Sequence, residues 1–133
     1  MSFFAALFVF AFALNIFWEN VHAPLYTDFK GSAITKRLLI FMALKDALVI
    51  CLLFFIAKNF VPANQMLVAF VIMAVLFAIT IEKHALATGR WHYKARMSLI
   101  PLLQTGVSPT VQLATTGLLA YGAVSVILGT MLQ

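Results

Sequence analysis

The stretch FFAALFVFAFALNIFW (Phe3–Trp18) contains no charged residue. A helix needs about 20 mostly apolar residues to cross the hydrocarbon core of a bilayer. Three further stretches of this kind follow, and we place the four membrane spans at about residues 2–21, 34–57, 63–88 and 109–132. The sequence therefore predicts an all-α integral membrane protein, a four-helix bundle with short loops that forms one domain over residues 1–133.

The composition of the whole chain supports this class. Of its 133 residues, 64% are hydrophobic and 10% are charged, whereas about 25% of the residues of a soluble domain are charged. A soluble globular domain and a disordered chain are both excluded. The single cysteine, Cys51, excludes an intrachain disulfide and a cysteine-based zinc site.

The basic residues gather in two of the connections between spans. Residues 22–37 contain three Lys or Arg and residues 83–108 contain four, whereas the connection between the second and third spans contains only Lys58. Short loops rich in Lys and Arg stay on the cytoplasmic side of a membrane. We therefore expect a multi-pass protein of the cell membrane, with both termini outside and residues 22–37 and 83–108 in the cytoplasm. The net charge of +5 then indicates contact with membrane lipids and no nucleic-acid partner.

The approach to the fourth span carries local signals. Ser108 followed by Pro109 predicts a helix start, with Ser108 as the N-cap. The apolar segment Leu99–Val107 before it is too short to cross the membrane and contains Pro101 and Gly106. We interpret this segment as an apolar loop on the helix ends, with a short re-entrant or interfacial segment as the alternative.

Polar residues inside the first two spans are informative because they are costly in a bilayer. Asn15, Glu19 and His22 share one stripe of the first helix. In the second span, Lys45 is long enough to reach back to the membrane surface. Asp46 is not, and lies about 13 Å from the cytoplasmic edge at a rise of about 1.5 Å per residue. Asp46 therefore needs a proton or a partner, for which Lys45 of another chain, Asn15 and a basic group of residues 83–108 are the candidates.

The outer halves of the four spans are nearly without polar residues and the cytoplasmic halves carry most of them, so antiparallel packing brings these residues together. We expect one cavity that opens to the cytoplasm or to the inner leaflet. The candidate catalytic residues are Glu19, His22, Asp46 and Glu82. The candidate substrate-binding residues are Asn15, Trp18, Lys45, Arg90, Trp91, Tyr93, Arg96, Gln104 and Gln112.

A metal centre is an alternative use of the same residues. Glu19 and His22 have the Glu-x-x-His spacing of one half of a carboxylate-bridged di-metal site, but the second copy of the motif is absent. A single ion held by Glu19, His22, Glu82 and either His84 or His92 is the remaining arrangement. We predict a hydrogen-bonded network in place of a metal, and the sequence indicates no cofactor.

These features favour a small membrane protein that binds or modifies an amphiphilic, lipid-like substrate in a polar intramembrane pocket. The sequence leaves open whether it is an enzyme. Two other functions fit the same pattern: an accessory subunit of a larger membrane complex, and a transporter or channel formed by a homo-oligomer.

Overall fold

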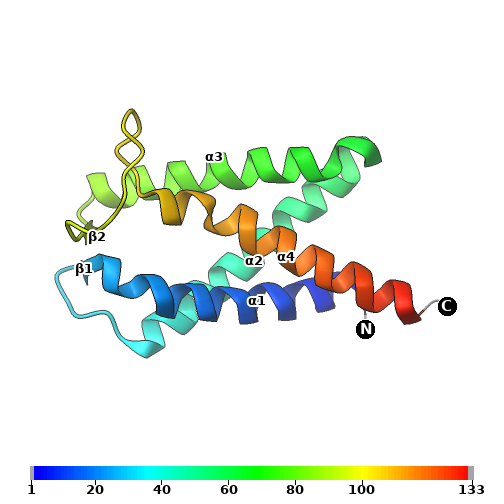
Figure 1. Cartoon of the computed structure of the whole chain (residues 1–133), viewed down its shortest axis with the longest axis horizontal. Coiled ribbons are helices and arrows are strands. Elements are labelled where there is room, and N and C mark those ends of the chain that lie inside the picture. Colours follow the sequence, from blue (N-terminus) through cyan, green and yellow to red (C-terminus); the bar gives the residue numbers. More distant parts are fainter. Residues whose placement is uncertain (1, 132–133) are drawn as a thin grey trace.

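A computed structural model describes residues 2–131 of the chain. Four helices dominate it, and two short 3-10 turns and a two-stranded sheet occupy the connections (Figure 1). The elements in chain order are α1 (Phe3–His22), η1 (Ala23–Leu25), β1 (Tyr26–Phe29), α2 (Lys36–Phe60), η2 (Ala63–Gln65), α3 (Met66–Ala87), β2 (Trp91–Tyr93) and α4 (Val107–Met131). The predicted all-α four-helix bundle is confirmed, and all four helices are long and apolar enough to cross a membrane.

Two helix starts illustrate the local signals. The side chain of Thr35 accepts a hydrogen bond from the Leu38 backbone and begins α2 there, close to the predicted start. The prediction for α4 was wrong in detail. The helix begins at Val107, so Ser108 lies within its first turn, and its hydroxyl is not a cap but has no hydrogen-bond partner among the described residues.

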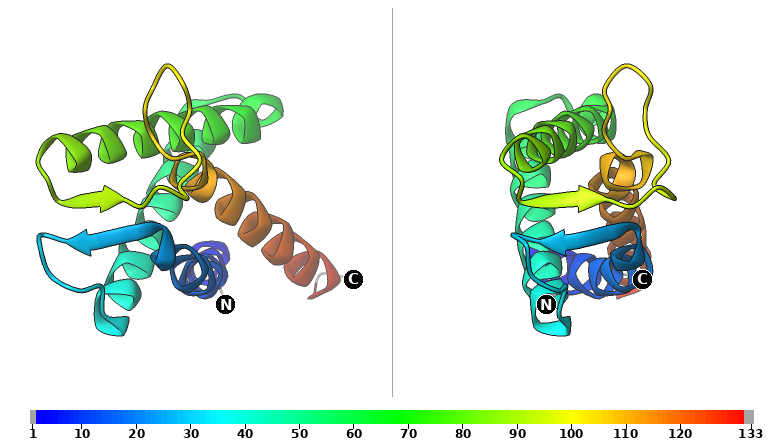
Figure 2. Two further views of the ribbon diagram at one scale, coloured as in Figure 1. Left: turned by 60° about the vertical axis from the view of Figure 1, so that its left-hand side comes forward. Right: turned by 90° about the vertical axis from the view of Figure 1, so that its left-hand side faces the viewer.

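The four helices pack around a ring in which α1 contacts α2 and α4, and α3 contacts α4 and α2. Helix α2 runs obliquely, from beside α1 at its start to beside α3 at its end (Figures 1 and 2). The start of α2 and the end of α3 therefore lie apart at one end of the bundle. This end carries β1 and β2, and we call it the sheet end. The opposite end, with the start of α1 and the end of α4, is the terminal end.

The two-stranded sheet ties the first and third connections together. Strands β1 and β2 are antiparallel, and Tyr26 pairs with Tyr93 and Phe29 with Trp91. A tight turn follows β1, in which Lys30 and Gly31 both have positive φ, and Gly tolerates this conformation at no steric cost. The sequence did not predict this sheet, because its strands are too short to show an alternating pattern of polar and apolar residues.

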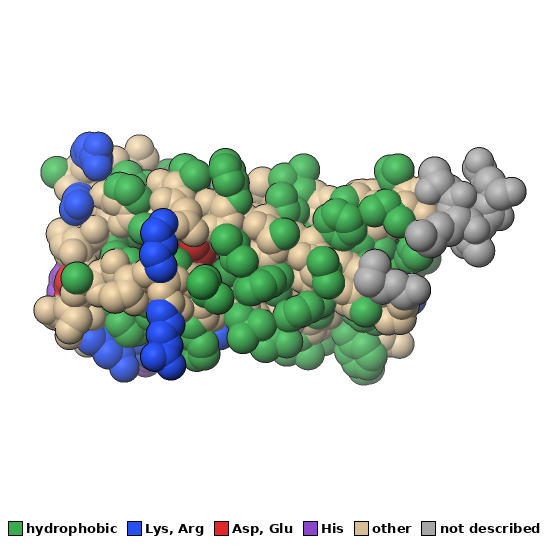
Figure 3. All heavy atoms as spheres, turned by 90° about the horizontal axis from the view of Figure 1, so that it is seen from below, with side chains coloured by type: hydrophobic (Ala, Val, Ile, Leu, Met, Phe, Trp, Pro, Cys, Tyr) green, Lys and Arg blue, Asp and Glu red, His purple; other side chains and the backbone are tan. Residues whose placement is uncertain are grey.

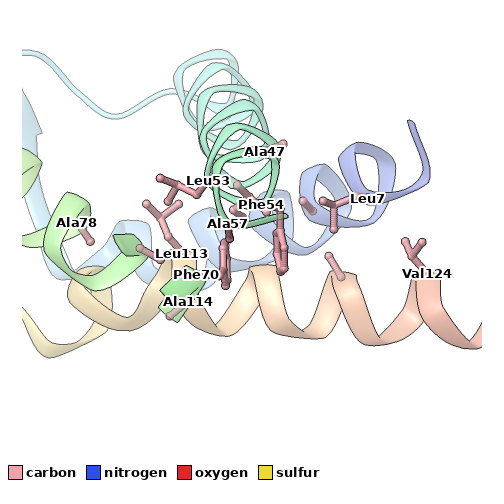
Figure 4. Close-up of a cluster of buried hydrophobic side chains, with 14 of the residues drawn as sticks. Leu7, Ala47, Leu53, Phe54, Ala57, Phe70, Ala78, Leu113, Ala114 and Val124 are labelled. Carbon is pink, nitrogen blue, oxygen red and sulfur yellow. The ribbon is translucent and has the colours of Figure 1, made fainter. Parts of the chain in front are cut away.

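The hydrophobic core fills the middle and the terminal end of the bundle (Figure 4). The Phe54 and Phe70 rings stack at 3.8 Å between their centroids. Gly117 of α4 packs directly on this pair, because a Cβ built there would lie 2.3 Å from the Phe70 ring. The close approach of α4 to α3 thus depends on a glycine at this position.

The segment before α4 forms an irregular hairpin that projects from the sheet end (Figure 1). An isolated bridge between Leu99 and Gly106 closes it, and the Ile100 backbone donates to the carbonyl of Thr105. Leu102 at its tip is 95% exposed. The segment contains no helix before Val107, and its position relative to a membrane stays a prediction.

Candidate functional site

A buried amide forms the base of the polar cluster. Asn15 of α1 is completely buried, and its Nδ2 donates to the Ala11 carbonyl at 2.8 Å and to the Thr116 hydroxyl at 3.2 Å. Its Oδ1 accepts from Nε2 of Gln112 at 3.1 Å. Asn15 therefore joins α1 to α4 at the level where the apolar core ends.

Gln112 connects this base to two carboxyl groups. Its Nε2 lies 2.8 Å from Oε1 of Glu19 and 2.8 Å from Oδ2 of Asp46. An amide nitrogen has two hydrogens, so three acceptors, including Asn15, compete for them. The Glu19 and Asp46 carboxyl groups also lie within hydrogen-bonding reach of each other. Residues from α1, α2 and α4 thus meet at one point.

No cation balances these two acids within residues 2–131. The only ion pair in this part of the chain joins His92 to Asp28 at 2.9 Å. The Lys45 ammonium lies over the Phe41 ring, 5.6 Å from its centroid, one helical turn back toward the start of α2. Within residues 2–131 the Asp46 carboxyl accepts a hydrogen bond from Gln112, and Lys45 of another chain stays a prediction. Two carboxylates this close repel strongly unless a proton or a cation accompanies them.

The third buried acid has a different role. Glu82 of α3 is 5% exposed, and its Oε2 accepts from the Trp91 indole at 3.3 Å and from the Tyr93 hydroxyl. The same hydroxyl accepts from the Gly106 backbone at 3.0 Å. Glu82 therefore holds β2 and the start of α4 against the end of α3, and its Oε2 is already engaged by two donors.

A cavity of about 190 Å³ opens beside these acids at the sheet end. Its walls between α2 and α3 are mostly apolar, with Met42, Val49, Phe77 and Ile81 among them. Phe77 and Ile81 are more than a third exposed, so the cavity reaches the surface along α3, where α2 and α3 diverge. Figure 3 shows that Lys and Arg gather at the same end, whereas the surface of the middle is mostly hydrophobic.

Two buried polar atoms beside the cavity have no protein partner among the described residues. They are Nε1 of Trp18 and the hydroxyl of Ser108, and both residues line the cavity. The Trp18 ring stacks on His22 at 4.5 Å, which fixes its orientation. A buried donor without an acceptor is unfavourable, so a ligand oxygen in the cavity would satisfy the indole.

Outside the spans, the sheet carries its own charge pattern. The hydrogen bond from His92, together with those from Thr27 and the Gly31 backbone, holds the pKa of Asp28 below its ordinary value. Burial raises the pKa of the Tyr26 and Tyr93 phenols, and the nearby Glu82 raises them further. Both phenols therefore remain protonated donors at neutral pH.

The structure brings most of the predicted site residues to the cavity and leaves four outside its lining, namely Asn15, Tyr93, Arg96 and Gln104. Those lining it are Trp18, Glu19, His22, Lys45, Asp46, Glu82, Arg90, Trp91 and Gln112, and Asn15 lies directly behind Gln112. Tyr93 acts through Glu82, Arg96 reaches only the Pro24 carbonyl, and Gln104 bonds within its own loop to Pro101.

The alternative metal centre does not assemble. Among residues 2–131, no three His, Cys, Asp or Glu side chains come close enough to hold one ion. His92 pairs with Asp28 on the sheet and His84 is exposed. Sequence reasoning also missed other residues of the cavity lining, among them Tyr26, Asp28, Phe29 and Ser108. The pairing of β1 with β2 places the first three there, and no local pattern announces it.

Comparison with known proteins does not identify a function for this site. No protein family model, no curated protein and no solved structure matches the chain. The function is therefore argued from the site alone.

Proposed function

We propose that the protein binds an amphiphilic, lipid-like molecule whose polar head enters the cavity at the sheet end. One observation carries this proposal. Glu19 and Asp46 share a neutral donor, Gln112, at the inner wall of a cavity whose other walls are mostly apolar and reach the bundle surface. Ligand sites combine apolar walls with a few convergent polar groups in this way.

The direction of entry follows from the splayed helices. The sheet covers the sheet end of the bundle (Figure 2), whereas Phe77 and Ile81 open the cavity toward the side between α2 and α3. In a membrane this side faces lipid tails. The head of the ligand would then contact the two acids while its tail remains between the diverging helices, in the leaflet from which it came.

We place that leaflet on the cytoplasmic side. Residues 22–37 and 83–108, which flank the sheet, carry most of the Lys and Arg, and such loops remain in the cytoplasm. The start of α1 and the end of α4 would then lie outside. Labelling of single cysteines introduced at Ser32 or at Asn64 in a Cys51→Ala background in intact cells checks this orientation, since only Asn64→Cys should react with a membrane-impermeant thiol reagent; the reverse result would contradict it.

The test of binding uses lipids that co-purify with the protein. The double variant Glu19→Gln, Asp46→Asn keeps the shape of both side chains and removes both ionisable groups. We expect native mass spectrometry to detect a bound amphiphile on the wild type and at least a tenfold lower occupancy on the variant. Gln104→Ala is the matched control, because Gln104 is exposed and lies outside the cavity lining.

The proposal fails if the double variant inserts, resists thermal unfolding like the wild type and carries the same bound molecules. It also fails if the wild type carries none under conditions in which lipids of its membrane are present. Loss of bound lipid in the Gln104→Ala control as well would show that occupancy does not depend on the cavity.

A further inference from the structure

The charges around the cavity are strongly one-sided. The chain contains four Asp and Glu in total and nine Lys and Arg. All four acids line this cavity, whereas only two of the basic residues, Lys45 and Arg90, do so. A protein with a net charge of +5 therefore gathers all four of its Asp and Glu side chains around one cavity.

Two of the four acids are already satisfied and two are not. Glu82 accepts from two aromatic side chains, and Asp28 accepts from His92, Thr27 and the Gly31 backbone. Glu19 and Asp46 have only the neutral amide of Gln112 as a common donor. The ammonium of Lys45, which also lines the cavity, lies over the Phe41 ring and forms no ion pair with either acid among residues 2–131. A positive charge in the cavity would therefore stabilise the Glu19 and Asp46 carboxylates.

The aromatic side chains of the cavity also favour a positively charged ligand. Five of them line it: Trp18, Tyr26, Phe29, Phe77 and Trp91. At the sheet, the Trp91 ring lies edge-on to Tyr26 with 6.0 Å between centroids and parallel to Phe29 at 6.4 Å. Aromatic faces attract ammonium groups, and clusters of such rings recognise quaternary ammonium ligands.

Resting on the proposed function, we infer that the head of the amphiphile is an ammonium group. The ammonium lies between Glu19 and Asp46 on one side and the aromatic rings on the other. The unpartnered indole N–H of Trp18 donates to an oxygen a few atoms away in the same ligand. The ligand class is therefore an amphiphile with an ammonium head and a neighbouring oxygen, as in an amino alcohol or an aminophospholipid.

The first experiment compares amphiphiles that share a dodecyl tail and differ in the charge of the head group. Wild-type protein in nanodiscs of phosphatidylglycerol, a lipid without ammonium, is titrated with dodecylammonium, dodecyl phosphate and dodecanol. The only two Trp residues of the chain, Trp18 and Trp91, both line the cavity, so intrinsic fluorescence reports occupancy directly. We expect dodecylammonium to bind at least tenfold more tightly than the other two.

Variants then separate site binding from partitioning into the bilayer. The double variant Glu19→Gln, Asp46→Asn should bind dodecylammonium at least tenfold more weakly than the wild type. The amount of dodecylammonium that partitions into the bilayer should stay the same. Lys45→Gln removes a positive charge from the rim and should bind dodecylammonium more tightly, by about two- to fivefold. This opposite sign keeps the inference testable even if the double variant does not fold.

A second set of nanodiscs distinguishes the sources of the ammonium. Inclusion of phosphatidylethanolamine should compete with dodecylammonium if an aminophospholipid fits the cavity, and should have no effect if only single-chain amines do. The inference is overturned if dodecyl phosphate or dodecanol binds more tightly in a manner that depends on Glu19 and Asp46. In that outcome the proposed function stands. If no head shows binding that depends on these residues, both fail.

Discussion

The sheet end and the terminal end of the bundle are stabilised by different interactions. At the terminal end, contacts between rings and small residues dominate, as Phe54, Phe70 and Gly117 show. At the sheet end, hydrogen bonds from Gln112, Trp91 and Tyr93 to buried acids dominate, and a cavity lies beside them. The terminal half therefore depends on apolar packing and the sheet half on buried hydrogen bonds.

The largest expected effect lies at the terminal end. Gly117→Ala adds a methyl group that would meet the Phe70 ring at 2.3 Å, and this ring is held by Phe54. Overpacking of this kind costs up to about 3 kcal/mol, measured as a lower free energy of unfolding in detergent. Gly122→Ala is the matched control on the same helix, because nothing lies within 4 Å of a Cβ there. Equal stability of the two variants would contradict the packing account.

The boundary between the two halves should respond next. Asn15→Ala removes a fully buried amide together with its hydrogen bonds to Thr116 and from Gln112, which we expect to cost about 2 kcal/mol of unfolding free energy. Asn59→Ala is the control, since Asn59 makes the same bond to the carbonyl one turn back but is exposed. A loss in the control as large as that in Asn15→Ala would show that the buried network contributes nothing beyond the local bond.

The four helices and the polar half of the bundle follow from the sequence, but the contacts between their side chains do not. An uninterrupted apolar run such as Phe3–Trp18 is long enough to predict a span from length and hydropathy alone. The position of Asp46 likewise predicts a buried acid. Which donor it meets depends on how α4 is rotated against α2, and hydropathy does not determine that rotation. Gln112 was therefore predicted as a binding residue but not as the donor shared by both acids.

The sheet shows a second limit of sequence reasoning. Trp91 and Tyr93 were interpreted as residues of the substrate site, on the basis of their aromatic and basic surroundings. Their register against Phe29 and Tyr26 instead aims their polar atoms at Glu82. Strand pairing between connections more than sixty residues apart leaves no periodic signal in segments of three or four residues.

A smaller effect is expected at the contact between the sheet and α3. Tyr93→Phe removes the hydroxyl that joins Glu82 to the Gly106 backbone. We expect a loss of about 1 kcal/mol and faster hydrogen exchange in β2 and the start of α4. Tyr121→Phe serves as the control, because Tyr121 contributes ring stacking on Phe54 and not this contact. Unchanged hydrogen exchange in β2 would show that the Tyr93 hydroxyl does not position the sheet.

The smallest effect concerns acidity. Because the pKa of Asp28 is lower in the folded protein than its ordinary value of 3.8, its bonds are fully present above that value and are lost as the pH falls through the folded pKa. Hydrogen exchange at β1 should therefore accelerate below about pH 4 relative to the bundle core. Asp28→Asn should remove this pH dependence, and its persistence in that variant would assign it to another group.

The most direct test is an experimental structure grown in a lipidic mesophase with a dodecylammonium amphiphile. The account predicts density for the ligand head between Glu19, Asp46 and the Trp18 indole, with its tail leaving between α2 and α3. A structure in which both carboxyl groups face the surrounding lipid, or in which side chains close the space between them and Trp91, would contradict it.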